Sequence, residues 1–106
     1  MIRLSILKDK NGNYKGIKAD GHAGFEDIGK DIVWSAVSVL LINTVNSIEK
    51  FTASRPIVND MAQMEFYFKD TPDEKAVLLM DSLVLGLYGI QKEYGKKYLK
   101  IKIKEV

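Results

Sequence analysis

The 106-residue sequence contains no cysteine and a single histidine, His22. A chain without cysteine has no disulfide framework, no thiolate metal site and no thiol nucleophile. With one histidine, a zinc site would rest mainly on carboxylates, which is an uncommon arrangement, so we expect no bound metal. Thiolate chemistry is therefore excluded, and a zinc site is not expected.

The sequence is equally poor in proline, in long apolar runs and in excess charge of one sign. Residues 1–5 (Met-Ile-Arg-Leu-Ser) alternate in polarity and do not form the apolar block of a signal peptide. The longest apolar run, around residues 37–42, is far too short to span a bilayer. The net charge of +2 is well short of the clustered basic footprint of a dedicated nucleic-acid binder. We therefore expect a cytoplasmic protein that neither enters a membrane nor binds nucleic acid directly.

The composition that remains is that of an ordered globular chain. Hydrophobic residues make up 46% of the sequence and charged residues 28%, whereas a disordered chain is poorer in apolar residues and less balanced in charge. The length suits one domain over residues 1–106, with no internal repeat. Because so short a chain buries only a modest core, we also expect a homodimer interface.

Alternating polarity predicts four strands. Residues 2–7 alternate as in a half-buried strand, and Asn11-Gly12 then predicts a hairpin turn to a second strand over residues 14–19. A third strand is expected over residues 63–68, where Met64 and two phenylalanines alternate with polar residues. The last strand, over residues 99–104, alternates apolar residues with lysine.

Two helices are expected between these strands. Asp31 is a suitable N-cap for a helix that continues to about Phe51 and is apolar on most sides, which indicates burial by the sheet and by a second helix or a second subunit. Residues 52–60 are expected to form a linker. Residues 71–74 (Thr-Pro-Asp-Glu) are typical of a helix start with Thr71 as cap, and Gly95 ends that helix.

The element order is therefore ββαβαβ, which places the protein in the α+β class. The hairpin makes at least part of the sheet antiparallel, and two helices on one face close a two-layer sandwich. We expect a largely antiparallel four-stranded sheet with two helices.

The segment between the second strand and the first helix is the richest in possible chemistry. His22 lies in a glycine-rich loop between two small residues, where an imidazole can act as general base and then as general acid. An isolated histidine is more often a surface residue bonded to backbone. What raises the interest is the helix that follows: a cysteine in its first turn, residues 32–35, would have a lowered pKa, and the amides there would bind an oxyanion. The residue at the expected place is Trp34.

The two serines that follow position 34 are weak substitutes for a nucleophile. Ser35 lies about 100° further around the helix and points away from whatever position 34 faces. Ser38 lies one turn further on the same face as position 34, where it would at best hydrogen-bond within a site. A helical serine more often bonds its own backbone.

Three short stretches together resemble a known family. They are residues 20–23 (Asp-Gly-His-Ala), residues 29–33 (Gly-Lys-Asp-Ile-Val) and residues 36–38 (Ala-Val-Ser). This arrangement resembles the ribosomal-processing cysteine protease family, Prp, whose motif is Gly-His-Ala, a short loop, then Gly-x-Asp-Ile-Val-Cys and a small-residue helix with a serine. The resemblance covers the whole chain in length and element order.

The resemblance implies a small homodimeric bacterial endopeptidase that needs no metal or cofactor. Members of the family remove the N-terminal extension of ribosomal large-subunit protein number twenty-seven. Carried over by residue, His22 takes the general acid/base role, while Gly21, Asp31 and Ser38 match supporting positions of the motif. Position 34, where the family has its nucleophilic cysteine, is Trp34, so we expect this chain to be inactive as a protease. A tryptophan codon is one base from a cysteine codon.

Two other functions compete with that of a protease. One is a non-catalytic module that keeps the peptide cleft and holds the ribosomal protein without cutting it. The other is a small protein that contacts ribosomal RNA through Lys100, Lys102 and Lys104. For those lysines we favour the solvated face of an edge strand, because no aromatic residue alternates with them.

Overall fold

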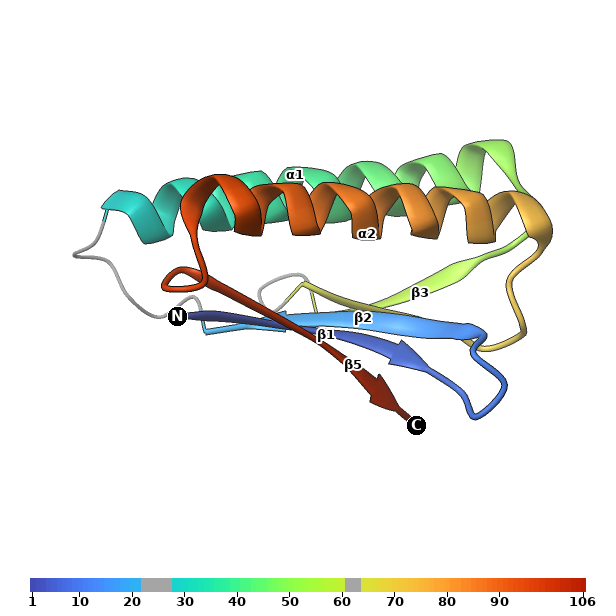
Figure 1. Cartoon of the computed structure of the whole chain (residues 1–106). Coiled ribbons are helices and arrows are strands. Elements are labelled where there is room, and N and C mark those ends of the chain that lie inside the picture. Colours follow the sequence, from blue (N-terminus) through green and yellow to red (C-terminus); the bar gives the residue numbers. More distant parts are fainter. Residues whose placement is uncertain (22–27, 61–63) are drawn as a thin grey trace.

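The computed structural model describes residues 1–21, 28–60 and 64–106, and it forms two layers (Figure 1). The elements in chain order are β1 (Ile2–Lys8), β2 (Tyr14–Asp20), α1 (Ile28–Phe51), β3 (Pro56–Asp60), β4 (Glu65–Phe68), α2 (Glu74–Tyr94) and β5 (Leu99–Glu105). Both helices lie on the same face of one sheet, as predicted.

The sheet has five strands, in the order β3-β4-β2-β1-β5. The pairings β1–β2, β2–β4 and β3–β4 are antiparallel, whereas β1–β5 is parallel. The predicted α+β class is confirmed, but the predicted four-stranded sheet and the order ββαβαβ are wrong, because the expected linker at residues 52–60 contains β3. Proline is tolerated in β3 because Pro56 is the first residue of an edge strand.

The hairpin between β1 and β2 follows the sequence prediction closely. The Asp9 carboxylate accepts hydrogen bonds from the backbone N–H groups of Asn11 and Asn13, at 2.8 and 3.0 Å. These bonds, the one from Asn13 above all, hold the pKa of Asp9 below its ordinary value. Gly12 takes a φ of 83°, a conformation that glycine adopts without a steric cost.

Helix α1 begins at Ile28, so the prediction that Asp31 caps it is wrong. Asp31 lies within the first turn, where its negative charge still favours the positive end of the helix dipole. Helix α1 includes the glycine at position 29, since a glycine lowers helix stability by only about 1 kcal/mol.

Helix α2 begins two residues later than predicted, with Asp73 rather than Thr71 as its cap. The Asp73 carboxylate accepts a hydrogen bond from the Ala76 N–H at 2.8 Å and another from the Ala53 N–H at 3.0 Å. Its own N–H donates to the Ser54 hydroxyl. This cap therefore also holds the connection between α1 and β3, which the sequence could not reveal. The predicted end at Gly95 is confirmed by its N–H bond to the Gln91 carbonyl at 2.7 Å.

The core lies between the helices and the sheet. The predicted apolar faces of β1 and β4 are buried in it, and its largest fully buried side chains are Phe68, Ile2, Leu4, Ile6, Ile17, Leu41, Ile48, Met80, Leu87, Leu99, Val33 and Val37. Tyr94 is 42% exposed, since it lies at the last turn of α2 beyond the packed part of the helix.

By length and composition, the segment Asp31–Phe51 of α1 also meets the criteria for a membrane-crossing helix, as core helices of globular proteins often do. Here α1 packs against α2 and the sheet, and buries Val33, Val37 and Ile48. Its outward side nevertheless keeps apolar residues, with Val39 exposed to 65%.

Candidate active site

Three of the five predicted site residues, Gly21, Asp31 and Trp34, lie toward one end of the molecule, and Ser38 lies near the middle of α1. Gly21 follows β2, and Asp31, Trp34 and Ser38 follow one another along α1. Figure 1 shows the end of β2, the N-terminus and the start of α1 at the same end of the fold. His22 lies outside the described residues, between Gly21 and the first turn of α1 in sequence.

The position of Gly21 admits no other residue without strain. Its φ is 91°, which side chains rarely adopt, and an added Cβ would collide with the carbonyl oxygen of Met1. The end of β2 thus passes close against the start of β1, and the direction in which the chain leaves toward residue 22 is fixed by that contact. This gives the motif glycine a steric reason that the sequence alone did not show.

Trp34 lies in the second turn of α1, not in the first as predicted. The indole is partly buried and packs against the hydrophobic core. Because α1 starts at Ile28, the amides of residues 32–35 lie inside the helix and donate to carbonyls four residues earlier. The prediction that these amides bind an oxyanion is therefore wrong, since the unpaired N–H groups belong to the preceding turn.

Ser38 is one turn beyond Trp34 on the same side of α1. Its Oγ is buried and makes no hydrogen bond with any described residue. The common alternative, a bond from the hydroxyl to the helix backbone, is thus not made here. A buried hydroxyl without a partner is unfavourable, so this atom is an exception among buried polar groups. Ser35, by contrast, is exposed and points away from this side, as expected.

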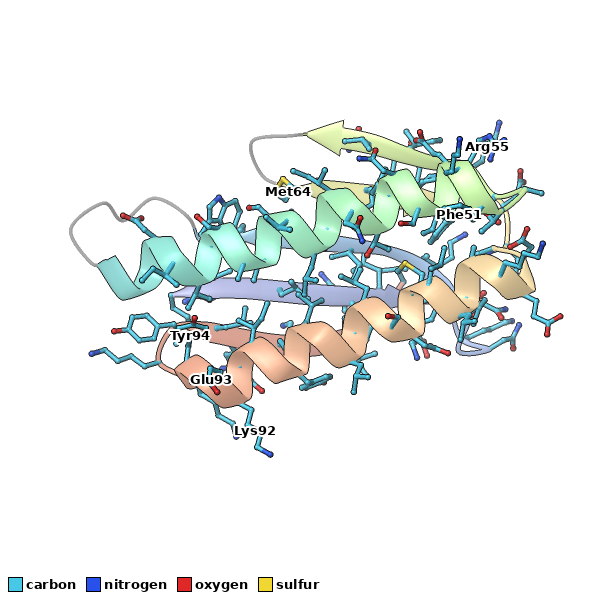
Figure 2. All side chains as sticks on the ribbon, turned by 90° about the horizontal axis from the view of Figure 1, so that it is seen from above. Phe51, Arg55, Met64, Lys92, Glu93 and Tyr94 are labelled. Carbon is cyan, nitrogen blue, oxygen red and sulfur yellow. The ribbon has the colours of Figure 1, made fainter. Side chains whose placement is uncertain are left out.

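An apolar cavity continues the same side of α1. Leu41 and Val45 follow Trp34 and Ser38 at helical spacing, and both line a cavity of about 170 Å³. Its opposite wall comes from Val58 of β3 together with Met64 and Phe66 at β4. Figure 2 shows Met64 beside α1 on the side of the sheet where β3 lies.

The candidate site is therefore one side of α1, which carries Trp34, Ser38, Leu41 and Val45 and is hollowed at Leu41 and Val45; we refer to this side as the groove. It runs from position 34, past an unpaired hydroxyl, to an apolar cavity whose first residue lies about 10 Å further along the helix axis. Sequence reasoning missed the cavity because one wall belongs to β3, which was read as a linker. Within the described parts of the chain, no three His, Asp or Glu side chains gather closely enough to hold a metal ion.

Comparison with known proteins agrees with this architecture. The sequence profile of the family described as cysteine protease Prp matches residues 1–100. This chain belongs to that family. The protein named ribosomal processing cysteine protease Prp in Staphylococcus aureus is 31% identical over 99 residues, covering 91% of this chain and 93% of the relative. Its namesake in Bacillus subtilis is 25% identical over 101 residues, covering 89% and 90%.

Solved structures of similar proteins have the same fold. The S. aureus ribosomal processing protease Prp in complex with a substrate peptide superposes with a TM-score of 0.86 at 30% identity, covering 98% of this chain and all of that one. A complex of the S. aureus protease with a covalently linked product peptide gives 0.82 at 30% identity, with the same coverage. SMU.848 from Streptococcus mutans gives 0.81 at 27% identity, covering 100% and 96%.

The family membership makes the missing residue conspicuous. A cysteine protease needs a thiolate to attack the peptide bond, and this chain has no cysteine at any position. The fold is therefore that of a Prp protease, while the thiol that defines the family's chemistry is absent.

Proposed function

We propose that this chain is a Prp protein that binds the N-terminal extension of ribosomal large-subunit protein number twenty-seven in the cytoplasm without cleaving it. The observation that carries the proposal is the close superposition on a peptide-bound Prp protease, together with the lack of any cysteine. A fold that keeps a peptide groove but has no nucleophile favours binding over hydrolysis.

The loss of activity is assigned to position 34. In the mechanism that the family resemblance implies, His22 takes the proton of a thiol at position 34, and the thiolate attacks the scissile carbonyl to form a thioester. His22 then protonates the leaving amine, and water releases the acyl group. Trp34 offers no nucleophilic lone pair, and its bulk occupies space that an acyl intermediate needs.

The groove along α1 suits an extended peptide with apolar side chains. An extended chain advances about 3.3 Å per residue, so the cavity at Leu41 would receive a side chain about three residues from the peptide bond at position 34. The unpaired hydroxyl of Ser38 lies between the two points and would bond a peptide backbone group.

We further propose that the chain acts as a homodimer through the outer side of its helix layer. Several large apolar side chains are exposed there, namely Ile32, Val39 and Ile42 of α1 and Leu78, Leu85 and Tyr88 of α2. A second copy would cover these residues, which is the usual role of a large exposed apolar patch on a small protein.

Peptide binding tests the proposal directly. A fluorescent peptide that spans the cleavage site of the ribosomal protein should bind at equilibrium, and mass spectrometry of the mixture should show only intact peptide. The matched variant is Val58→Asp, which places a charge at the cavity at a position that is 40% exposed, and it should weaken binding at least tenfold if the groove is used. Absence of binding by the unaltered chain, or cleavage by it, would contradict the proposal.

A further inference from the structure

The face of the sheet opposite the helices carries a cluster of cations, of which the sequence indicated only the three lysines of the last strand. Figure 1 shows both helices on one side of the sheet, and none of the described elements covers the other side. Five cationic side chains from three adjacent strands point to this open face: Arg3, Lys18, Lys100, Lys102 and Lys104. We call these five residues the basic face.

The strand register sets the cations close together. Arg3 of β1 lies beside Lys100 of β5, and Ser5 lies between Lys102 of β5 and Lys18 of β2. Neighbouring strands are about 4.8 Å apart, and residues on one side of a strand repeat about every 6.7 Å. The short side chain of Ser5 leaves a hollow of about 290 Å³ among the longer ones.

These cations are not paired by the fold. Within the described residues no ion pair engages any of the five, and Asp20 is the one acidic residue that lines the hollow. The open face of the sheet carries five cations against Asp20 and Glu65, while the whole chain has a net charge of only +2. The rest of the molecule is therefore not basic. Arg3 and Lys100 are like charges directly opposite each other, an arrangement that is destabilising in a sheet and that a bound anion would relieve.

Protection of a sheet edge explains only part of the cluster. Lysines on an edge strand discourage pairing with another sheet, and β5 is an edge strand. Arg3 and Lys18, however, belong to β1 and β2, which have neighbours on both sides. Asp20 lies opposite Arg3 and Glu65 lies opposite Lys18, so cross-strand pairing accounts for part of their placement. The cations that remain in excess beside them indicate a surface for an anionic partner.

We propose that the basic face binds the phosphate backbone of single-stranded RNA. A two-dimensional array of cations suits a polymer with repeated negative charges better than one small anion, and lysine is a frequent phosphate ligand. Tyr67 of β4 lies on the same side of the sheet and is 37% exposed, which supplies an aromatic ring on which a base can stack. Gly16 of β2 lies opposite Tyr67, and a side chain at that position would collide with the β4 backbone, since an added Cβ would lie 2.8 Å from the Tyr67 Cα.

The choice of RNA rests on the proposed function, because a protein that handles a ribosomal protein works beside ribosomal RNA. The test needs neither the peptide nor cleavage, so the two proposals fail separately. The low net charge of +2 led us to expect no direct binding of nucleic acid, but the positive charge is concentrated on one face of the sheet.

Fluorescence anisotropy of a labelled twelve-nucleotide uridine RNA with the full chain tests the inference. If about four phosphates are neutralised, affinity should fall about 50-fold between 50 and 200 mM salt. The double variant Lys18→Gln/Lys102→Gln should lose at least about tenfold in affinity at low salt, and its salt slope should shrink by about 1.4. Lys100→Gln/Lys104→Gln provides a second variant with the same expectation, and Tyr67→Leu should weaken binding several-fold without changing the salt slope.

The matched control is Lys75→Gln/Lys92→Gln, which removes the same charge from exposed positions on α2. It should change affinity by less than about twofold. Equal losses in the control and in the basic-face variants would overturn the inference, as would RNA binding that salt does not weaken. Binding to vesicles with anionic lipid or to polyglutamate, without binding to RNA, would also overturn it.

Discussion

At the scale of single residues, position 34 and its neighbour Ser38 define what the site can do. The indole of Trp34 packs against the core, and one turn later a buried hydroxyl has no partner among the described residues. A helical serine that bonded its backbone would be a structural detail, whereas an unpaired one is a cost that a bound peptide group removes. This side of α1 therefore combines an unpaired hydroxyl with a nearby apolar cavity, the two features on which the proposed peptide binding depends.

A second residue-scale feature is the contact between Tyr14 and Asp81. The Tyr14 hydroxyl donates to the Asp81 carboxylate at 2.6 Å, and it joins β2 to α2. We predict that Tyr14→Phe lowers the free energy of unfolding by about 1 kcal/mol, measured by urea denaturation. Tyr88→Phe, at an exposed position on α2, is the control and should have no effect. Equal stability of Tyr14→Phe and the unaltered chain would contradict the role of this bond.

The hydrogen bond between Tyr14 and Asp81 also predicts how the stability of the fold changes with pH. Burial, and then the Asp81 carboxylate, raise the pKa of the Tyr14 hydroxyl above its ordinary value of 10.0. The stabilisation is therefore fully present below pH 10 and is lost as the pH rises through the raised value. Unfolding measured in alkaline buffer should show this loss in the unaltered chain and not in Tyr14→Phe.

At the scale of elements, the N-terminus of α2 carries more than a helix cap. Backbone N–H groups of Ala76 and Ala53 both bond the Asp73 carboxylate, and the first of these is the main reason that its pKa lies below the ordinary value of 3.8. A group with a lowered pKa stabilises the fold above its unfolded value and loses that effect as the pH falls through the folded value.

Two variants separate the cap from the charge. Asp73→Asn keeps an acceptor for the helix N–H groups but cannot titrate, so its thermal stability should fall less than that of the unaltered chain between pH 4 and about pH 2. Asp73→Ala loses the cap and should be less stable at every pH. Asp70→Asn, an exposed carboxylate nearby, is the control. If Asp73→Ala were as stable as Asp73→Asn at neutral pH, the cap would have no role.

The elements that the sequence predicted are those whose signals are local. The hairpin at Asn11-Gly12 and the end of α2 at Gly95 each depend on a few adjacent residues, and both are confirmed. Strand β3 was missed because it is only five residues long, starts with Pro56 and is largely exposed at an edge. The groove could be predicted only along α1, since helical spacing relates Trp34 to Ser38 but says nothing of the strand that faces them.

At the scale of the whole molecule, the two outer surfaces differ in kind. The helix layer exposes apolar side chains, including Val39 at 65% and Leu85 at 76%, whereas the open side of the sheet carries the basic face. One side therefore suits a second copy and the other an anion, and the groove along α1 lies apart from the basic face, on the helix side of the sheet.

The proposed homodimer gives a prediction at this scale. Val39→Glu should shift the chain from twice the mass of a single copy to that of one copy, measured by light scattering during size-exclusion chromatography at micromolar concentration. A buried charge at such an interface removes most of its stability. Ile57→Glu, which also replaces an exposed apolar residue with glutamate but on the opposite side of the molecule, should leave the mass unchanged. A single-copy mass for the unaltered chain would contradict the dimer.

If this chain differs from an active Prp protease only in the nucleophile at position 34, the variant Trp34→Cys should cleave peptide. This measurement tests the proposed role of position 34 most directly. The unaltered chain and the variant are incubated with the peptide that spans the ribosomal-protein cleavage site, and products are read by mass spectrometry. We predict intact peptide with Trp34, cleavage at one site with Trp34→Cys, and loss of that cleavage in His22→Ala/Trp34→Cys. A folded Trp34→Cys protein that binds the peptide but leaves it uncut would contradict the assignment of position 34.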